Sequence, residues 1–295
     1  NITVTNTNDA PTVANPIANQ TVAEDSALSF QFNTNVFADI DPGDTFSYAA
    51  TLSDGSALPS WLSFNASTRT FSGTPLNGNV GTIAVKVTAT DSGSATVFDT
   101  FNITVTNTND TPTVANSMVD QTISEDSALS YQFNANVFAD VDAGDTFSYA
   151  ATLKGGGALP SWLNFDAASR TFSGTPLNGD IGTIAVDVTA TDAGGATVIA
   201  GFELTVTNTN DAPTVANPIA NQTVAEDSAL SFQFNSNVFA DVDPSDTFSY
   251  AATLSNGSAL PSWLSFNAST RTFSGTPLNG NVGTIAVKVT ATDSG

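Results

Sequence analysis

The sequence predicts an all-β protein built of tandem antiparallel β-sandwiches in a linear array, and three observations predict it. The chain repeats itself at intervals of 101 residues, as Trp61, Trp162 and Trp263 show. Apolar and polar residues alternate over short segments rich in Thr, Val and Phe, which is typical of half-buried strands. Gly, Pro, Asn and Asp interrupt these segments at short intervals, and no segment has a helical period.

Each repeat is long enough to be a domain, because roughly 100 residues can bury an independent core. Residues 10–93 and 212–295 differ at four positions, and the middle copy is more diverged but has no net insertion. We expect these domains: 1–9, the last strand of a preceding repeat; 10–110, repeat 1; 111–211, repeat 2; and 212–295, repeat 3 without its last strand.

The strands of repeat 1 follow one another at short intervals. A first strand begins after Pro11, and Trp61 lies in the apolar segment LPSWLSF, where we expect it in the core rather than on a sugar-binding surface. The other clear segments are Leu28–Phe32, Thr45–Leu52, TRTFSGTP around Phe71, Thr82–Thr90 and Phe101–Thr108. About seven short strands in ~100 residues predict a seven-stranded sandwich of immunoglobulin-like type.

An odd number of strands brings the chain in at one end of a sandwich, its N-terminal pole, and out at the other, its C-terminal pole. The loop 37–44 and the turn 91–93 then share the N-terminal pole with the incoming linker, whereas Glu24 shares the C-terminal pole with the outgoing linker. The polar residues expected to converge between repeats 1 and 2 are Glu24, Asn109, Asp110, Asp140, Asp142 and Asp192.

The composition indicates what these polar clusters bind. The chain has a net charge of −22, with only six basic residues and no His or Cys. Converging carboxylates repel one another unless a cation lies between them. Carboxylate, amide and carbonyl oxygens suit Ca²⁺ better than Mg²⁺, and zinc is disfavoured without His or Cys. The acids at the poles recur in all three copies, whereas Asp54 and Asp99 do not.

The same composition argues against other functions. A nucleic-acid partner needs a basic surface, which six Lys and Arg residues cannot supply. No segment approaches the ~20 apolar residues of a membrane-spanning helix, so we expect no membrane insertion. Paired acids occur in glycosidases, but here they lie in short loops at the ends of domains, so we expect no enzyme. The Gly-rich turns SGTPLNGNVG and GGG lack the context of a nucleotide-binding loop.

Several motifs resemble those of known adhesion domains. VTATDSG…FNITVTNTND resembles the cadherin pattern A-x-D-x-G, a last strand and a D-x-N-D-N-x-P linker. FADIDPGD together with LPSWLSF and FSGTP is similar to the dystroglycan-type cadherin-like domain and to the "putative Ig" repeats of giant bacterial adhesins. The resemblance covers the whole chain and implies tandem cadherin-like sandwiches in an extracellular or cell-surface protein.

The resemblance also implies Ca²⁺ at the junctions. Its ligands would be Asn8, Asp9, Asp39, Asp41 and Asp91; Glu24, Asn109, Asp110, Asp140, Asp142 and Asp192; and Glu125, Asn210, Asp211, Asp241, Asp243 and Asp293. The early glutamate of the third copy is Glu226. The D-R-E motif of cadherins is missing, and its region reads FSGTPLNGN. We therefore expect one or two ions for each junction.

The predicted function is mechanical: a spacer or adhesion repeat of a large bacterial surface or secreted protein, stiffened by Ca²⁺ and contacting neighbouring repeats of its own chain. One alternative is a module that binds polysaccharide or like chains in a calcium-dependent way. Another is a filament subunit, because residues 1–9 match Asn102–Asp110 and could complete the third sandwich of a second chain. We expect instead that the sequence is a window from a longer array.

Overall fold

The structure is a computed structural model that describes residues 1–243 and 246–295. Repeat 1 contains β1 (Thr12–Val13), β2 (Gln20–Ala23), β3 (Leu28–Gln31), β4 (Phe37–Ala38), β5 (Ser47–Leu52), β6 (Leu62–Asn65), β7 (Thr70–Gly73), η1 (Asn77–Asn79), β8 (Gly81–Thr90) and β9 (Thr96–Thr106). Repeat 2 contains β10 (Thr113–Val114), β11 (Gln121–Ser124), β12 (Leu129–Gln132), β13 (Phe138–Ala139), β14 (Ser148–Leu153), β15 (Asn164–Asp166), β16 (Thr171–Gly174), η2 (Asn178–Asp180), β17 (Gly182–Thr191) and β18 (Thr197–Thr207). Repeat 3 contains β19 (Thr214–Val215), β20 (Leu230–Gln233), β21 (Phe239–Ala240), β22 (Ser249–Leu254), β23 (Leu264–Asn267), β24 (Thr272–Gly275), η3 (Asn279–Asn281) and β25 (Val287–Thr292).

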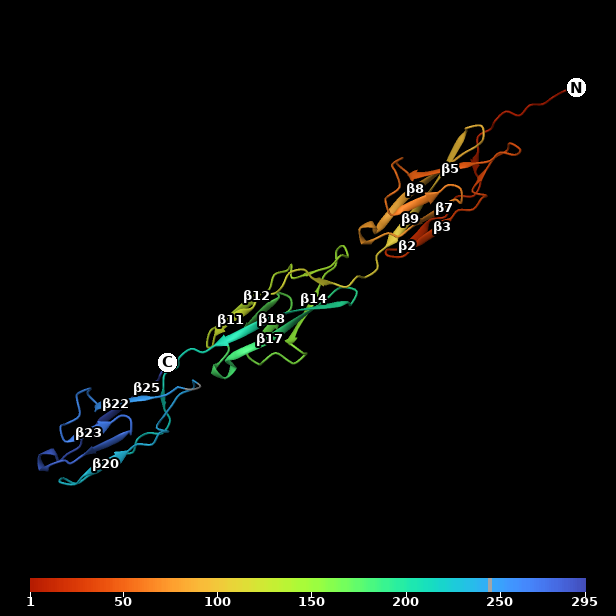
Figure 1. Cartoon of the computed structure of the whole chain (residues 1–295). Coiled ribbons are helices and arrows are strands. Elements are labelled where there is room, and N and C mark those ends of the chain that lie inside the picture. Colours follow the sequence, from red (N-terminus) through yellow and green to blue (C-terminus); the bar gives the residue numbers. More distant parts are fainter. Residues whose placement is uncertain (244–245) are drawn as a thin grey trace. The chain divides into compact units, whose positions relative to one another are not determined.

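Two sheets form the sandwich of repeat 1 (Figure 1). One has the strand order β2-β9-β8-β5 and the other β3-β7-β6, and β1 pairs with β4. Repeat 2 has the same arrangement, with the orders β11-β18-β17-β14 and β12-β16-β15 and the pair β10-β13. In the described part of repeat 3, β25 pairs only with β22. The predicted all-β sandwich is confirmed.

The strand expected after Pro11 is two strands with different partners. β1 pairs antiparallel with β4, placing Thr12 opposite Ala38. β2 pairs parallel with β9, placing Gln20 opposite Ile103. By changing partner, this first segment pairs its backbone groups with two parts of the sandwich, which covers exposed edges. Alternation alone predicts the segment but not this change of partner.

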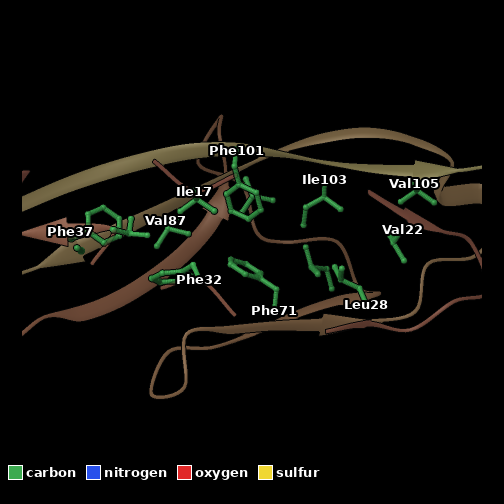
Figure 2. Close-up of a cluster of buried hydrophobic side chains, with 14 residues drawn as sticks. Ile17, Val22, Leu28, Phe32, Phe37, Phe71, Val87, Phe101, Ile103 and Val105 are labelled. Atoms are coloured by element: carbon green, nitrogen blue, oxygen red, sulfur yellow. The ribbon is translucent and has the colours of Figure 1, made fainter. Parts of the chain in front are cut away.

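The core of repeat 1 lies between its two sheets, where Figure 2 shows Phe32, Phe71 and Phe101 among aliphatic side chains. Phe71 is fully buried, and its ring meets that of Phe101 edge-on at 5.5 Å between centroids. Trp61 packs against this cluster, as the sequence predicts. Fully burying each such aromatic or aliphatic side chain contributes roughly 1.5–3 kcal/mol.

The chain divides into two compact units. The first is Asn1–Asn116, Phe138–Ser148 and Thr189–Val198, and the second is Ser117–Val137, Tyr149–Val188 and Ile199–Gly295. The polar cluster between repeats 1 and 2, which we call junction 1, lies within the first unit. The cluster between repeats 2 and 3, junction 2, lies within the second. Among the described residues, no helix has the length and apolar character needed to cross a membrane.

Candidate metal centres

The N-terminal pole of repeat 1 gathers acids from two loops. Carboxylate oxygens of Asp39, Asp44 and Asp91 lie within 4.8 Å of one another. The incoming linker reaches this pole: Asn8 Nδ2 donates to Asp91 Oδ2 at 3.2 Å. The N–H of Asp9 donates to Asp41 Oδ2 at 2.7 Å, while the Asp9 side chain stays exposed.

Junction 1 combines acids from two successive repeats. Carboxylate oxygens of Glu24, Asp110 and Asp142 lie within 4.8 Å of one another. Glu24 directly follows β2 and begins the turn there, Asp110 lies in the linker, and Asp142 lies in the loop after β13. The N–H of Asp110 donates to Asp142 Oδ2 at 2.8 Å, so the linker is attached directly to the following repeat.

Glu24 is the most unusual member of this group because it is buried to 1% exposure. Its Oε1 accepts a hydrogen bond from the N–H of Thr108 at 2.8 Å, which fixes the side chain against the outgoing linker. Its Oε2 is buried and has no hydrogen-bond partner in the described part of the chain. A buried polar atom without a partner is costly, so this oxygen requires an explanation.

A second acid group lies in the same junction and shares one carboxylate with the first. Oxygens of Asp140, Asp142 and Asp145 lie within 4.8 Å of one another. Asp140 Oδ1 accepts the N–H of Asp142 at 3.0 Å, whereas the buried Oδ2 atoms of Asp140 and Asp145 have no hydrogen-bond partner among the residues that the structure describes. Asp192 stands beside this group and is held by Asn109 Nδ2 at 3.1 Å.

Junction 2 repeats the arrangement. Glu125, Asp211 and Asp243 form one group, and Asp241, Asp243 and Asp246 form the other. Glu125 is 2% exposed, and its Oε2 again has no hydrogen-bond partner among the described residues. Asn210 Nδ2 donates to Asp293 Oδ1 at 3.3 Å, in the place that Asn109 takes at junction 1.

Burial, neighbouring charges and hydrogen bonds shift the pKa values of three of these acids. Burial raises the pKa of Asp145, and the neighbouring charges of Asp140, Asp192 and Asp142 add to the effect. Burial likewise raises the pKa of Asp211, with Asp243 as the largest charge contribution. Burial pushes the pKa of Asp192 up, but hydrogen bonds from Asn109 and the amides of residues 194–196 outweigh it and hold the pKa below its ordinary value.

The glycine of the A-x-D-x-G pattern has a physical reason here. A Cβ on Gly194 would lie 1.9 Å from Oδ1 of Asn109, and one on Gly93 would lie 2.0 Å from Oδ1 of Asn8. Real Cβ atoms do not approach so closely, so only glycine lets the linker asparagine lie flat over this turn. The glycine therefore positions the amide that holds Asp192.

Two kinds of residue in these clusters were missing from the predicted set. Asp44, Asp145 and Asp246 each complete an acid group, and they recur three residues after the D-x-D pair in every copy. Asn77 and Asn178 donate to Asp142 and Asp243, although their loop was interpreted only as a turn. The strand count that placed Glu24 at the C-terminal pole also places this loop there. That count could therefore have identified Asn77 and Asn178 as residues of the junctions.

The chain is similar to curated adhesins. It is 32% identical over 207 residues to "Serine-rich adhesin for platelets" of Staphylococcus aureus, covering 70% of this chain and 8% of the adhesin. It is 31% identical over 207 residues to the protein of that name from strain MRSA252, covering 70% of this chain and 14% of that protein. The chain thus spans a small part of these relatives.

Among solved structures, the fold is similar to cadherin repeats. Mouse cadherin-23 EC22-24 matches with a TM-score of 0.63 and 16% identity, covering 98% of this chain and 95% of that one. Human CDH23 EC21-23 matches with a TM-score of 0.55 and 16% identity, covering 93% and 96%. These likenesses confirm the predicted tandem cadherin-like sandwich as a fold.

The pattern of the family described as "Putative Ig domain" matches the chain three times, over residues 10–106, 111–207 and 212–295. These matches cover most of the sequence. The chain therefore belongs to this family, as three tandem repeats.

Proposed function

We propose that the chain is a spacer and adhesion segment of a larger bacterial surface or secreted protein, and that Ca²⁺ at its junctions fixes the alignment of neighbouring sandwiches. The family and the adhesin relatives support the first part. The observation that carries the second part is the buried Glu24, whose Oε2 lacks a partner within a group of three carboxylates. Glu125 repeats that observation at junction 2.

The residues present fit a hard divalent cation. All side-chain ligands available at the junctions are oxygens, and Ca²⁺ takes six to eight oxygens at flexible spacing. At junction 1, Glu24, Asp110 and Asp142 would hold one ion. Asp140, Asp142 and Asp145 would hold a second, so the carboxylate of Asp142 would serve both. Bound Ca²⁺ supplies the positive charge that these crowded carboxylates lack.

The mechanism is a linkage between ion binding and alignment. Glu24 comes from one sandwich and Asp142 from the next, so both reach the ion only when the two domains are aligned. Ca²⁺ that binds this alignment shifts the population toward it. It also stabilises the fold by an amount set by free Ca²⁺ and the Kd, about 2.7 kcal/mol for one site at 100 times its Kd. Because the ligands must be ionised, acid and chelators should both weaken the junctions.

Calcium titration of the full chain tests this function, using the double variant Glu24→Gln/Glu125→Gln. Isothermal calorimetry at up to millimolar Ca²⁺ should show binding to the native chain, because extracellular sites have Kd values of roughly 10⁻⁴–10⁻³ M. The double variant should lose the glutamate-containing sites. Glu226→Gln is the matched control, since Glu226 is the corresponding residue of repeat 3 and is exposed.

Small-angle scattering of the same samples tests the mechanical part. The radius of gyration of the native chain should change between Ca²⁺ and EDTA, and the double variant should show a smaller change than Glu226→Gln. A native chain that releases no binding heat, or whose radius of gyration is the same in Ca²⁺ and EDTA, contradicts calcium-dependent alignment.

A further inference from the structure

An asparagine side chain of repeat 1 reaches the acids of repeat 2, and one of repeat 2 reaches the acids of repeat 3. Asn77, the first residue of η1, donates from Nδ2 to Asp142 Oδ1 at 2.8 Å. Asn178, the first residue of η2, donates to Asp243 Oδ1 at 3.0 Å. The contact is therefore made twice, each time to the carboxylate that both acid groups of the junction share.

The loop that carries Asn77 is braced independently of this contact. Asn79 Oδ1 accepts the N–H of Leu76 at 2.9 Å, and the N–H of Asn79 donates back to the carbonyl of Leu76 at 2.7 Å. In repeat 2, Asp180 takes the role of Asn79 and accepts the N–H of Leu177 at 2.9 Å. Because the third residue of the turn closes the loop, the first residue is free to extend toward the next repeat.

The same loop is tied to the buried glutamate. The N–H of Asp25 donates to the carbonyl of Pro75 at 2.8 Å. Asp25 directly follows Glu24 in the sequence, and Pro75 lies two residues before Asn77. Asp126 and Pro176 repeat this bond at 2.8 Å. One backbone bridge thus places the glutamate and the asparagine of a sandwich together at its C-terminal pole.

Asn77 completes the fixing of Asp142. The linker N–H of Asp110 holds Oδ2, and Asn77 holds Oδ1, so both oxygens of the shared carboxylate are oriented by donors from outside its own loop. An amide N–H offsets negative charge without adding a charge of its own. It therefore lowers the repulsion among the acids before any cation arrives, and it leaves their net charge available to the cation.

The N-terminal pole of repeat 1 has the same bond between the incoming linker and the acidic loop. Asp41 Oδ2 accepts the N–H of Asp9, as Asp142 accepts that of Asp110. Among the described residues, the acid group at that pole consists of Asp39, Asp44 and Asp91.

We propose that Asn77 and Asn178 are positioning residues of the junction cation sites: each amide orients the shared carboxylate, Asp142 or Asp243, from the preceding sandwich. Each couples that sandwich to the ion through one hydrogen bond and keeps the junction partly assembled in the absence of Ca²⁺. This inference rests on the proposed calcium-binding function.

The test compares Asn77→Ala/Asn178→Ala with Asn279→Ala in the full chain, by calcium calorimetry and by melting in Ca²⁺ and in EDTA. Asn279 occupies the same loop of repeat 3, where the described residues include no carboxylate that accepts its amide. The double variant should bind Ca²⁺ about tenfold more weakly, the size of effect found for partners that orient metal ligands. The control should bind as the native chain does.

A second pair of substitutions separates positioning from general support of the loop. Asn77→Asp/Asn178→Asp replaces the donor with a further carboxylate, so its melting temperature should fall in EDTA and its rise on adding Ca²⁺ should exceed that of the native chain. A loop residue with only a structural role would lower the melting temperature equally in both conditions. Native affinity in the double alanine variant overturns the inference alone, whereas a native chain that binds no Ca²⁺ overturns the proposed function and the inference with it.

Discussion

Repeats 1 and 3 carry almost the same sequence but differ in how much of it is buried. Residues 10–93 and 212–295 differ at four positions, yet Val85 is fully buried while its counterpart Val287 is 38% exposed. Glu24 is 1% exposed, and its counterpart Glu226 is exposed. In repeat 1, β9 lies between β2 and β8 (Figure 1), whereas within the described residues of repeat 3 β25 pairs with β22 alone.

The difference shows which properties belong to the sequence of a repeat and which come from the strand and linker that follow. β9 supplies Phe101, Ile103 and Val105, all exposed by 2% or less, to the core of repeat 1. The linker after β9 supplies the N–H of Thr108 that holds Glu24. The burial of Glu24 therefore depends on β9 and on the linker after it, and not on the loop that carries Glu24.

The largest predicted effect comes from giving repeat 3 the contacts that β9 makes in repeat 1. A peptide with the sequence of residues 96–109 should bind repeat 3 in the register of β9 on β8, with the equivalent of Ile103 opposite Ile285. Burying three apolar side chains gives a gross gain of roughly 5 kcal/mol or more. Association and ordering of the peptide offset part of this gain, so that about 2 kcal/mol remains. The melting temperature should then rise on the order of 10 °C at saturation, since 1 kcal/mol shifts a domain of this size by about 4–8 °C.

Hydrogen exchange measures this effect at the strand itself. The amides of residues 283–292 should become protected when the peptide is added, because they gain ladder partners. A control peptide with Ser in place of the equivalents of Phe101 and Ile103 should protect them much less. Equal protection by both peptides would mean that backbone pairing, and not the core, explains the difference between the two repeats.

The next effect concerns the shared carboxylate. Asp142→Asn removes a ligand from both acid groups of junction 1, so the stabilisation by Ca²⁺ at that junction should be lost, about 2.7 kcal/mol for each site at 100 times its Kd. Asp41→Asn is the matched change in repeat 1, where Asp41 belongs to none of the acid groups found among the described residues. Differential scanning calorimetry in Ca²⁺ should show the larger loss for Asp142→Asn; similar losses would refute the special role of the junction.

A smaller effect is expected at the linker glycine. Gly194→Ala would place a Cβ 1.9 Å from Asn109 Oδ1 and displace the amide that holds Asp192. We expect a loss of about 1–3 kcal/mol of stability, since the new methyl group meets a side chain that must move. Gly179→Ala is the control, because a Cβ there meets nothing within 4 Å. Thermal melting of both variants checks the prediction, and an unaffected Gly194→Ala would contradict it.

These comparisons also show what the sequence could and could not predict. Alternation predicted the strands, and counting them placed Glu24 and the linker acids at the same pole, because the direction of each strand follows from the one before. The partner change between β1 and β2 escaped the count, since it depends on which sheet edge each segment meets. Asn77 escaped it too, because its contact with Asp142 depends on how a loop of one repeat approaches a loop of the next.

The smallest predicted effect is that the pH dependence of stability in mild acid has opposite signs without and with Ca²⁺. The raised pKa values of Asp145 and Asp211 mean that the folded state holds these protons more tightly than the unfolded state. The ion-free fold should therefore gain stability as the pH falls from 7 toward the ordinary Asp value of about 3.9. The lowered pKa of Asp192 acts in the opposite sense, since its contribution is present above that ordinary value and is lost at lower pH.

In EDTA the melting temperature should thus pass through a maximum in mild acid, whereas in Ca²⁺ it should fall steadily, because protons compete with the ion for the same oxygens. Asp145→Asn/Asp211→Asn should abolish the rise in EDTA, since it removes the two carboxyls whose protonation relieves the repulsion. The two curves for the native chain then approach each other in acid, where protons and Ca²⁺ neutralise the same charges. A melting temperature that falls in EDTA as steeply as in Ca²⁺ would show that repulsion among these acids does not limit the ion-free junction.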